Sequence, residues 1–531
     1  PPPPPFFQAE DGIRDALVGL VGSEMCIRDS SRLIPLWLAT LLLSACATGL
    51  QPVESTPEFT PAPRQTMQWQ TLNAVRQDDW FHLLNTGSDA LDWRLRAIDS
   101  AEDSIDLQTF IWDLDGSGGA IKQHLLDAAA RGVFVRVLVD DSFILDADQE
   151  LLDIDQHQNI ELKVFNPYKR RSSHAAMREV LNLGEFHRLD HRMHNKVMVI
   201  DNQVAVLGGR NLADHYFGYD ESDNFRDMEV VAGGPIVHQL ADGFDLYWND
   251  GWSFPVSTVM EVRAGPGSPQ KVKQSATLLP EAHREESAQE RMAAWIQLAK
   301  SAHSGTARLL LDDPPEDNPA ADGQAPVQVA EQLVREIDAS RKEIWLVSAY
   351  LIPTPEIEAA IQRAEERGVE VRILTNSINS NNHITAHSAY RKHIRTLLEI
   401  GAEMHEVRFD AEDRDLYIES PVDNKTLCLH AKVLLFDNNR VFIGSANLDP
   451  RSMHINTEMG LMIESESLNA NVREALEPDF SPRNAWQLQL REDGRVVWVS
   501  DKETLDHQPT HSFMRRIEDW FFSLLPIENE M

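Results

Sequence analysis

The sequence is poor in cysteine and in basic residues, and it has no long hydrophobic run. Its three cysteines, Cys26, Cys46 and Cys428, are too few for a disulfide framework and lack the spacing of a zinc site. Acidic residues outnumber basic ones by 84 to 49, which gives a net charge of −35. Proteins hold nucleic acid through Lys and Arg, so this balance argues against nucleic acid as a partner. It also disfavours docking onto anionic lipid by broad charge attraction.

The first 46 residues are expected to lie outside the folded protein. Residues 1–30 show no folding pattern and resemble translated sequencing adapter, so we treat them as a non-native leader. The apolar run over 33–43 has the length of a signal-peptide core and is too short to span a bilayer. It ends at Cys46 in a string similar to a bacterial lipobox, in which cleavage leaves a lipidated cysteine. Residues 31–46 therefore predict a lipoprotein signal, an uncleaved segment being the alternative. With Ala47 next, the expected location is the periplasmic side of the cell envelope, on the outer rather than the inner membrane.

An internal repeat organises the rest of the chain, and its last strand begins at Arg131 and again at Arg367, 236 residues later. Each copy predicts a helix, an apolar strand, a second helix and a second strand, with Gly132 or Gly368 at the helix end before the last strand. The copies cover 91–99, 105–112, 120–130 and 131–139, then 329–340, 344–351, 356–366 and 367–374. This alternation indicates an α/β fold of two similar α/β/α halves, each a mixed sheet flanked by helices, around a pseudo-twofold axis.

The expected organisation follows from this repeat. We assign 47–75 to a Pro-containing tether, 76–255 to the first half, 256–325 to a connecting region with a helix near 281–302, 326–480 to the second half and 481–531 to a C-terminal extension. Near the end, Phe513, Ile517, Trp520, Phe521 and Leu524 fall on one helical face. Core packing is the favoured role for this stripe, and shallow membrane contact is the alternative.

One motif occurs twice, again 236 residues apart. The first copy contains His194, Lys196, Asp201, Gly208, Gly209 and Asn211, and the second contains His430, Lys432, Asp437, Gly444, Ser445 and Asn447. On a strand, residues i and i+2 share a face, so each His and its Lys project to one side. The glycines are expected to let the backbone turn closely and bring each Asn back beside them. For Asp201 and Asp437 the alternative to a functional role is a structural one, as turn residues between strands. Two copies in register strongly favour a functional role.

The doubled motif is similar to the HxKxxxxDxxxxxxG(G/S)xN signature of the phospholipase D superfamily. The strings over 192–196, 208–218 and 447–452 resemble the bacterial cardiolipin synthases, C-type class, as does 524–528. A lipobox departs from the pattern of that class. The resemblance implies an enzyme with one active site between two halves, a phospholipid substrate and phosphatidyl transfer through a phosphohistidine. Hydrolysis of the same lipid is the alternative, followed by a nuclease or a non-catalytic lipid-binding protein. The resemblance to the family also implies that His194 is the nucleophile and that His430 is the acid and base.

The residue types suit this chemistry. Lys196, Lys432, Asn211 and Asn447 supply donors for the non-bridging oxygens of a phosphodiester. An imidazole with an ordinary pKa of about 6.5 serves both as nucleophile and as proton carrier. Because Lys and Asn neutralise the phosphate charge, no metal or other cofactor is required.

A catalytic imidazole also needs its second nitrogen held by an acceptor. Each half offers one soon after its motif, Asp227 in the first and Glu458 in the second. Glu229 is the rival in the first half, and a surface carboxylate is the plainer reading for either candidate.

A few further residues are weaker candidates. By resemblance, His387 and Tyr390 border the substrate, with a helix-surface histidine as the alternative. His215, Tyr216 and Phe217 either line the same mouth or simply pack, and Cys428 is expected to be a small buried filler rather than a catalytic thiol.

Overall fold

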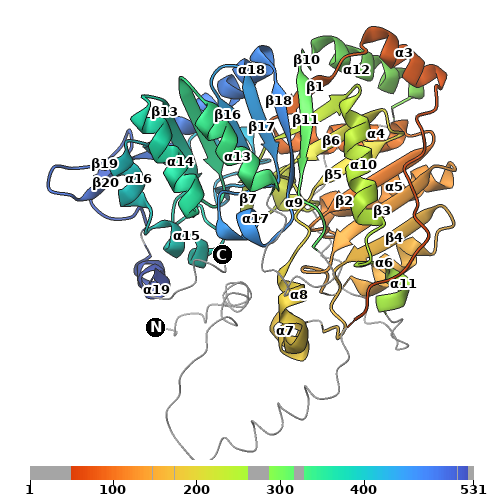
Figure 1. Cartoon of the computed structure of the whole chain (residues 1–531), viewed down its shortest axis with the longest axis horizontal. Helices are drawn as coiled ribbons and strands as arrows, with labels where there is room; N and C mark the ends of the chain where they lie inside the picture. The colour runs from red at the N-terminus through yellow and green to blue at the C-terminus, as the bar shows by residue number, and fades with distance from the viewer. Residues whose placement is uncertain are drawn as a thin grey trace, which may run out of the picture.

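Two mixed β-sheets stand side by side in the computed structural model, each with helices on its faces (Figure 1). The structure describes residues 50–145, 147–172, 174–260, 286–315, 328–510 and 512–523. The predicted leader, the predicted signal with Cys46, and the string 524–528 lie outside these residues. Within the described ranges, no helix is long and apolar enough to cross a membrane.

The two sheets repeat one strand order. In space, the first sheet runs β10 (His303–Ser304), β1 (Trp80–Leu84), β8 (Glu229–Gly233), β6 (Val204–Gly208), β5 (Val197–Ile200), β2 (Ser104–Thr109), β3 (Phe134–Asp140), β4 (Ile160–Phe165) and β9 (Ser253–Pro255). The second runs β11 (Thr306–Leu311), β18 (Met459–Glu464), β17 (Arg440–Gly444), β16 (Lys432–Phe436), β12 (Glu343–Ser348), β13 (Glu370–Asn376), β14 (Glu403–Val407), β19 (Ala485–Leu490), β20 (Val496–Val499) and β21 (Thr504–Leu505). The central strands β2, β3 and β4 are parallel, as are β12, β13 and β14, and the strands beyond them are antiparallel. The predicted mixed sheets are confirmed.

Helices follow the predicted repeat. The first half has α4 (Gly87–Ser100), α5 (Gly116–Ala130) and α6 (Asp148–Asp155), and the second has α13 (Gln328–Ala339), α14 (Pro355–Glu366) and α16 (Ile394–Ile400). Both α5 and α14 start on a side-chain cap, from Asp115 and Thr354 respectively. After them Gly132 and Gly368 have φ of +98° and +78°, the left-handed conformation that ends a helix at low cost on glycine.

The two sheets share a core. Apolar side chains of β5 and β6 pack with those of β16 and β17, together with α10 (Ile236–Trp248) and α18 (Glu466–Leu476). Separate apolar clusters lie under the outer helices of each half. Since both faces of each sheet are covered, β5 and the four residues of β16 after Lys432 are unbroken apolar runs rather than alternating ones. The halves therefore meet along the strands that follow the two motif histidines.

The segment before the first half is not a free tether. Residues 50–66 form no helix or strand, yet Val53 N–H donates to Gly251 O (2.8 Å) and Thr60 N–H donates to Asp245 Oδ2 (2.7 Å). A helix that the sequence reading missed, α3 (Met67–Val75), follows and buries Trp69. In the connecting region, α12 (Ala288–Ser301) lies within the helix predicted near 281–302.

The C-terminal stripe corrects a prediction. The last described helix, α19 (Phe513–Ser523), packs against α15 (Ile384–Tyr390), but Ile517, Trp520 and Phe521 are 41%, 55% and 51% exposed. Asp519 is buried instead, since its carboxylate pairs with His387 and Arg391. Core packing is therefore wrong for the described part of this stripe; the Phe513 side chain and Leu524 lie outside it.

Candidate active site

The motif histidines stand where the chain enters the shared core. His194 precedes β5, and His430 lies between β15 (Thr426–Leu429) and β16. The neighbouring pieces are β7 (Asp223–Arg226), α9 (Asp214–Phe217) and α17 (Pro450–His454), which lie between the two sheets in Figure 1. The site is thus built from both halves.

Backbone pairing crosses from one half to the other at this point. β7 of the first half pairs in parallel with β15 of the second, with Arg226 opposite Leu429. Met193 forms a matching parallel bridge with Thr457. As a result, the His194 N–H donates to Thr457 O (2.9 Å) and the His430 N–H donates to Arg226 O (2.8 Å). Each histidine therefore lies beside the segment that carries the carboxylate of the other half.

The imidazole partners are crossed in the same way. His194 Nδ1 lies 3.0 Å from Glu458 Oε2, and His430 Nδ1 lies 2.6 Å from Asp227 Oδ2. Sequence proximity would pair each carboxylate with the histidine of its own half, and the parallel bridges impose the opposite. Glu229, the rival candidate, is engaged elsewhere in a buried ion pair with Arg94 and Arg210. Both predicted carboxylates thus contact an imidazole, in exchanged positions.

The glycines of the motif make room for these carboxylates and for the next strand. A Cβ on Gly209 would lie 2.4 Å from the Asp227 carboxylate, and one on Gly444 would lie 2.3 Å from Met459 O. A Cβ on Gly208 would lie 2.5 Å from the Glu229 side chain. None of the three has a positive φ, so close packing, not the predicted turn, requires glycine here. At the position equivalent to Gly209, the Ser445 hydroxyl donates to Glu458 instead.

The two motif lysines lower the pKa of both motif imidazoles. Lys196 Nζ donates to His194 O (2.6 Å), and Lys432 Nζ donates to His430 O. Burial, and after it the charges of both lysines, lower the pKa of His194 well below its ordinary value. Burial also lowers the pKa of His430 to about 3, again with help from both lysines and against the pull of Asp227. The four groups therefore form one electrostatic cluster.

The cluster holds both imidazoles neutral at neutral pH. In that state Nδ1–H donates to the carboxylate and Nε2 keeps its lone pair. Burial lowers the pKa of Lys196 to about 7 and that of Lys432 to about 8, so a bound phosphate would restore their charge.

The two carboxylates differ in charge. Burial raises the pKa of Glu458 to about 7, opposed by Lys196 and Ser445. The pKa of Asp227 is lowered despite burial, because His430, Lys432 and Arg210 surround it. Asp227 is thus fully ionised at neutral pH, whereas Glu458 is ionised in part.

The asparagines and the motif aspartates have different positions. Asn211 and Asn447 are buried; Asn211 Oδ1 accepts from Ile111 N–H (3.2 Å), and within the described residues Asn447 Oδ1 has no hydrogen-bond partner. Asp201 accepts from the N–H groups of Asp103 and Ser104 and from Trp69, and Asp437 accepts from those of Arg341 and Lys342. Both aspartates hold chain connections at the far ends of β5 and β16, in agreement with the structural reading.

Aromatic rings flank the histidines. Phe110 lies edge-on to His194 at 4.8 Å between ring centroids, and Tyr216 and Phe225 lie 5.0 and 5.1 Å from His430. Tyr216 is among the residues singled out from the sequence, whereas Phe110 and Phe225 are not. Phe110 falls within the strand predicted over 105–112, so its place directly after β2 was the available signal.

The remaining candidates are placed away from open solvent. His387 and Tyr390 are fully buried; His387 Nδ1 lies 2.8 Å from Asp519, and Tyr390 donates to Glu406 (3.0 Å). The helix-surface reading of His387 is therefore wrong, and its role beside substrate stays a prediction. Phe217 and Cys428 are buried. Burial raises the pKa of the Cys428 thiol, which keeps it protonated and fits a buried filler rather than a catalytic thiol.

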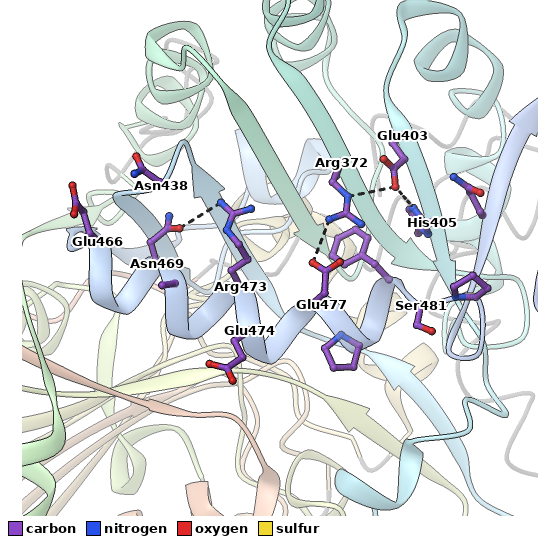
Figure 2. Close-up of a pocket in the computed structure, with 15 residues that line it drawn as sticks. Arg372, Glu403, His405, Asn438, Glu466, Asn469, Arg473, Glu474, Glu477 and Ser481 are labelled. Carbon is purple, nitrogen blue, oxygen red and sulfur yellow. Dashed lines mark hydrogen bonds and ion pairs between the residues drawn. The ribbon is translucent and has the colours of Figure 1, made fainter.

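A concavity of about 1110 Å³ lies elsewhere, over α18 and the second sheet (Figure 2). Its cations are already paired: Arg372 with Glu403 and Glu477, and Arg473 with Glu343. None of the motif residues lines it, so we place the chemistry at the histidines. In the described part of the chain, no group of three or more His, Cys, Asp or Glu side chains is placed to hold a metal ion.

Two sheets of equivalent order around a doubled His, Lys and Asn set define the phospholipase D class of fold. The family model "Cardiolipin synthase, PLD-like domain" matches residues 95–248 and 333–480, one segment in each half. The chain belongs to this family of phospholipase D-like cardiolipin synthases.

Individual relatives agree with this assignment. Cardiolipin synthase C of Escherichia coli is 34% identical over 461 residues, which cover 84% of this chain and 94% of the relative. An uncharacterized protein of Helicobacter pylori is 30% identical over 450 residues, covering 82% of this chain and 87% of the relative. The crystal structure of phosphatidylserine synthase from Haemophilus influenzae shares the fold, with a TM-score of 0.55 at 13% identity over 88% of this chain and 100% of that one.

Proposed function

We propose that this phospholipase D-superfamily enzyme transfers a phosphatidyl group from one phospholipid to the hydroxyl of another and forms cardiolipin-like products. The observation that carries the proposal is the pair of crossed imidazole–carboxylate contacts within reach of two lysine charges. Membership of the cardiolipin synthase family supports the choice of a phospholipid substrate.

In the first step, Nε2 of one neutral imidazole attacks phosphorus and displaces the headgroup alcohol. Its Nδ1–H bond to a carboxylate fixes the tautomer and stabilises the positive charge that develops on the ring. Lys196, Lys432, Asn211 and Asn447 bind the non-bridging oxygens. An ammonium has three donors, so the bond from each lysine to a histidine carbonyl leaves two for phosphate.

The second imidazole carries the proton. In its cationic form it protonates the departing alkoxide; it then takes a proton from the acceptor hydroxyl, which attacks the phosphohistidine and releases the first imidazole. The charge of the bound phosphate offsets the burial that keeps this imidazole neutral in the free enzyme.

The difference between the carboxylates supports His430 as acid and base and His194 as nucleophile. An imidazole that must become a cation benefits from a fully ionised partner, and Asp227 has the lowered pKa. Glu458, with a pKa of about 7, provides less counter-charge to His194 and favours its neutral, nucleophilic form.

The N-terminal sequence also suggests where in the cell the enzyme is located. Residues 31–46 would be a lipoprotein signal and Cys46 the lipidated residue, anchoring the enzyme on the periplasmic side of the envelope, on the outer membrane. Mass spectrometry of the mature N-terminus tests this point. A free or unprocessed Cys46 contradicts it.

The activity test uses detergent-solubilised protein with labelled phosphatidylglycerol and phosphatidylethanolamine, without added metal. We expect diphosphatidylglycerol. Phosphatidate as the sole product would indicate hydrolysis, and cleavage of single-stranded DNA without lipid turnover would contradict the substrate class. The His430→Ala variant should lose turnover while keeping its fold, as checked by circular dichroism.

A further inference from the structure

Helix α19 carries its apolar side chains on the wrong side for a core helix. Asp519 points into the protein and pairs with His387 and Arg391, while Met514, Ile517, Trp520 and Phe521 are exposed. This arrangement holds the helix to α15 through its polar groups. The apolar face is therefore turned outward by specific contacts, not left over by loose packing.

A second helical projection in the other half has the same character. In α7 (Ala175–Leu181), the Arg178 guanidinium is buried and donates to the carbonyls of Asp141 and Ile144. Met177 and Val180 in the same helix are exposed, as is Phe186 at the start of α8 (Phe186–Asp190). Here too a charged residue faces the protein and apolar residues face outward.

Both projections adjoin the strands that lead into the active site. α8 ends four residues before His194, and Asp190 at its end is bound by Arg451 of α17 (2.9 Å). α19 lies near the other entry, because Arg515 Nη1 donates to Ile378 O (3.1 Å), two residues after Asn376, whose side chain exchanges hydrogen bonds with the backbone of Leu429 in β15. Figure 1 shows α7, α8 and α19 projecting from the same lower edge of the molecule.

An aromatic path connects His194 with the outside. Phe110 contacts His194 at 4.8 Å, and Phe143 contacts Phe110 at 5.3 Å between centroids. Phe143 is 46% exposed. Apolar surface thus extends from the reacting imidazole toward solvent, where an acyl chain would need it.

We infer that α7, α8 and α19 form a docking surface for a phospholipid bilayer, with the active site between them facing the headgroups. This inference rests on the proposed function for the nature of the substrate, and it adds how the enzyme meets that substrate. Tryptophan and phenylalanine beside other apolar residues suit the bilayer interface, where such a face inserts about 5–10 Å. A protein of net charge −35 gains little from anionic headgroups, so this surface would be held to the bilayer by apolar contact rather than by charge attraction.

The test places single fluorescent probes on the full chain. Ile517→Cys and Val180→Cys report on the two projections, and Leu246→Cys, an exposed position of α10, is the matched control. Cys26→Ser and Cys46→Ser remove competing thiols and the lipidation site, while the buried Cys428 remains. A polarity-sensitive dye is attached, and vesicles of phosphatidylcholine with brominated acyl chains are added.

We expect the probes at 517 and 180 to shift to the blue and to be quenched by the brominated lipid, while the probe at 246 does neither. Contact through one projection alone, or equal responses at all three positions, overturns the inference, as does binding to another protein without any response to vesicles. The probes report contact and not chemistry. Turnover in detergent without a probe response would therefore contradict the docking surface and leave the proposed function standing. A probe response without turnover would contradict the proposed function and leave the docking surface standing.

Discussion

Replacing Glu458 with Gln isolates the charge that supports the proposed nucleophile. Gln can still accept a hydrogen bond from Nδ1 of His194, which lies 3.0 Å from the carboxylate. What is lost is a negative charge about 4 Å from the developing imidazolium, which at an effective dielectric of about 20 is worth ~4 kcal/mol. Glu458 is ionised only in part, because its pKa is raised to about 7. We therefore expect a loss of ~3 kcal/mol, roughly 100-fold in kcat/KM.

The assay compares this variant with Asp227→Asn on two substrates. With a natural headgroup both variants should lose activity, since attack and protonation of the leaving group are both needed. With a phosphatidyl p-nitrophenyl ester, the leaving group needs no proton, and the burst of p-nitrophenolate reports attack alone. Asp227→Asn should then recover most of its burst rate, whereas Glu458→Gln should remain slow. Thermal melting of both variants controls for folding.

The opposite pattern would refute the crossed assignment, provided that the nucleophile is identified independently. Acid-quenched enzyme with labelled lipid fixes it by mass spectrometry of the phosphorylated peptide. With the label on His194, a slow burst in Asp227→Asn and a normal burst in Glu458→Gln would mean that each carboxylate serves its own half after all.

Three further outcomes follow from the same site. Gly209→Ala should lower stability by about 1–3 kcal/mol, because its Cβ would lie 2.4 Å from the Asp227 carboxylate, whereas Gly119→Ala in α5 meets nothing within 4 Å and should stabilise the helix slightly; thermal melts compare them. Lys196→Met should lower kcat/KM by roughly 10²–10³ without a matching loss of melting temperature, which steady-state assays and melts check together. With the p-nitrophenyl ester, which needs no proton from His430, kcat/KM should pass through a maximum near pH 7, because Glu458 is protonated below it and Lys196 and Lys432 lose their protons above it; a rate that stays level to pH 10 contradicts this.

The repeat made the fold predictable. Helix, strand, helix and strand recur in the same order in both halves, the motif recurs 236 residues later, and each prediction for one half is checked by the other. Gly132 and Gly368 could be assigned to helix ends because only the local backbone decides their conformation. The motif residues were equally accessible, since their spacing along one strand fixes which side chains share a face.

Contacts between segments that are distant in the chain could not be predicted from the sequence. Glu458 meets His194 across 264 positions, through a bridge between Met193 and Thr457 that leaves no periodic signal in the sequence. The orientation of α19 was misjudged for a similar reason. Its apolar stripe suits a core helix, and only the pairing of Asp519 with His387, 132 positions away, turns that stripe outward.

The crossed contacts make the docking of the halves part of the chemistry. Neither half alone supplies a histidine together with its carboxylate, so packing of β5 against β16 is what gives each imidazole its tautomer. Two identical halves would produce two equivalent pairs. In one chain the pairs are free to differ, and they do: glycine at 209 leaves space for an ionised Asp227, while Ser445 at the equivalent position binds Glu458, whose pKa is raised by burial. A difference at one small residue thus accompanies the proposed division between a proton carrier and a nucleophile in an otherwise symmetric site.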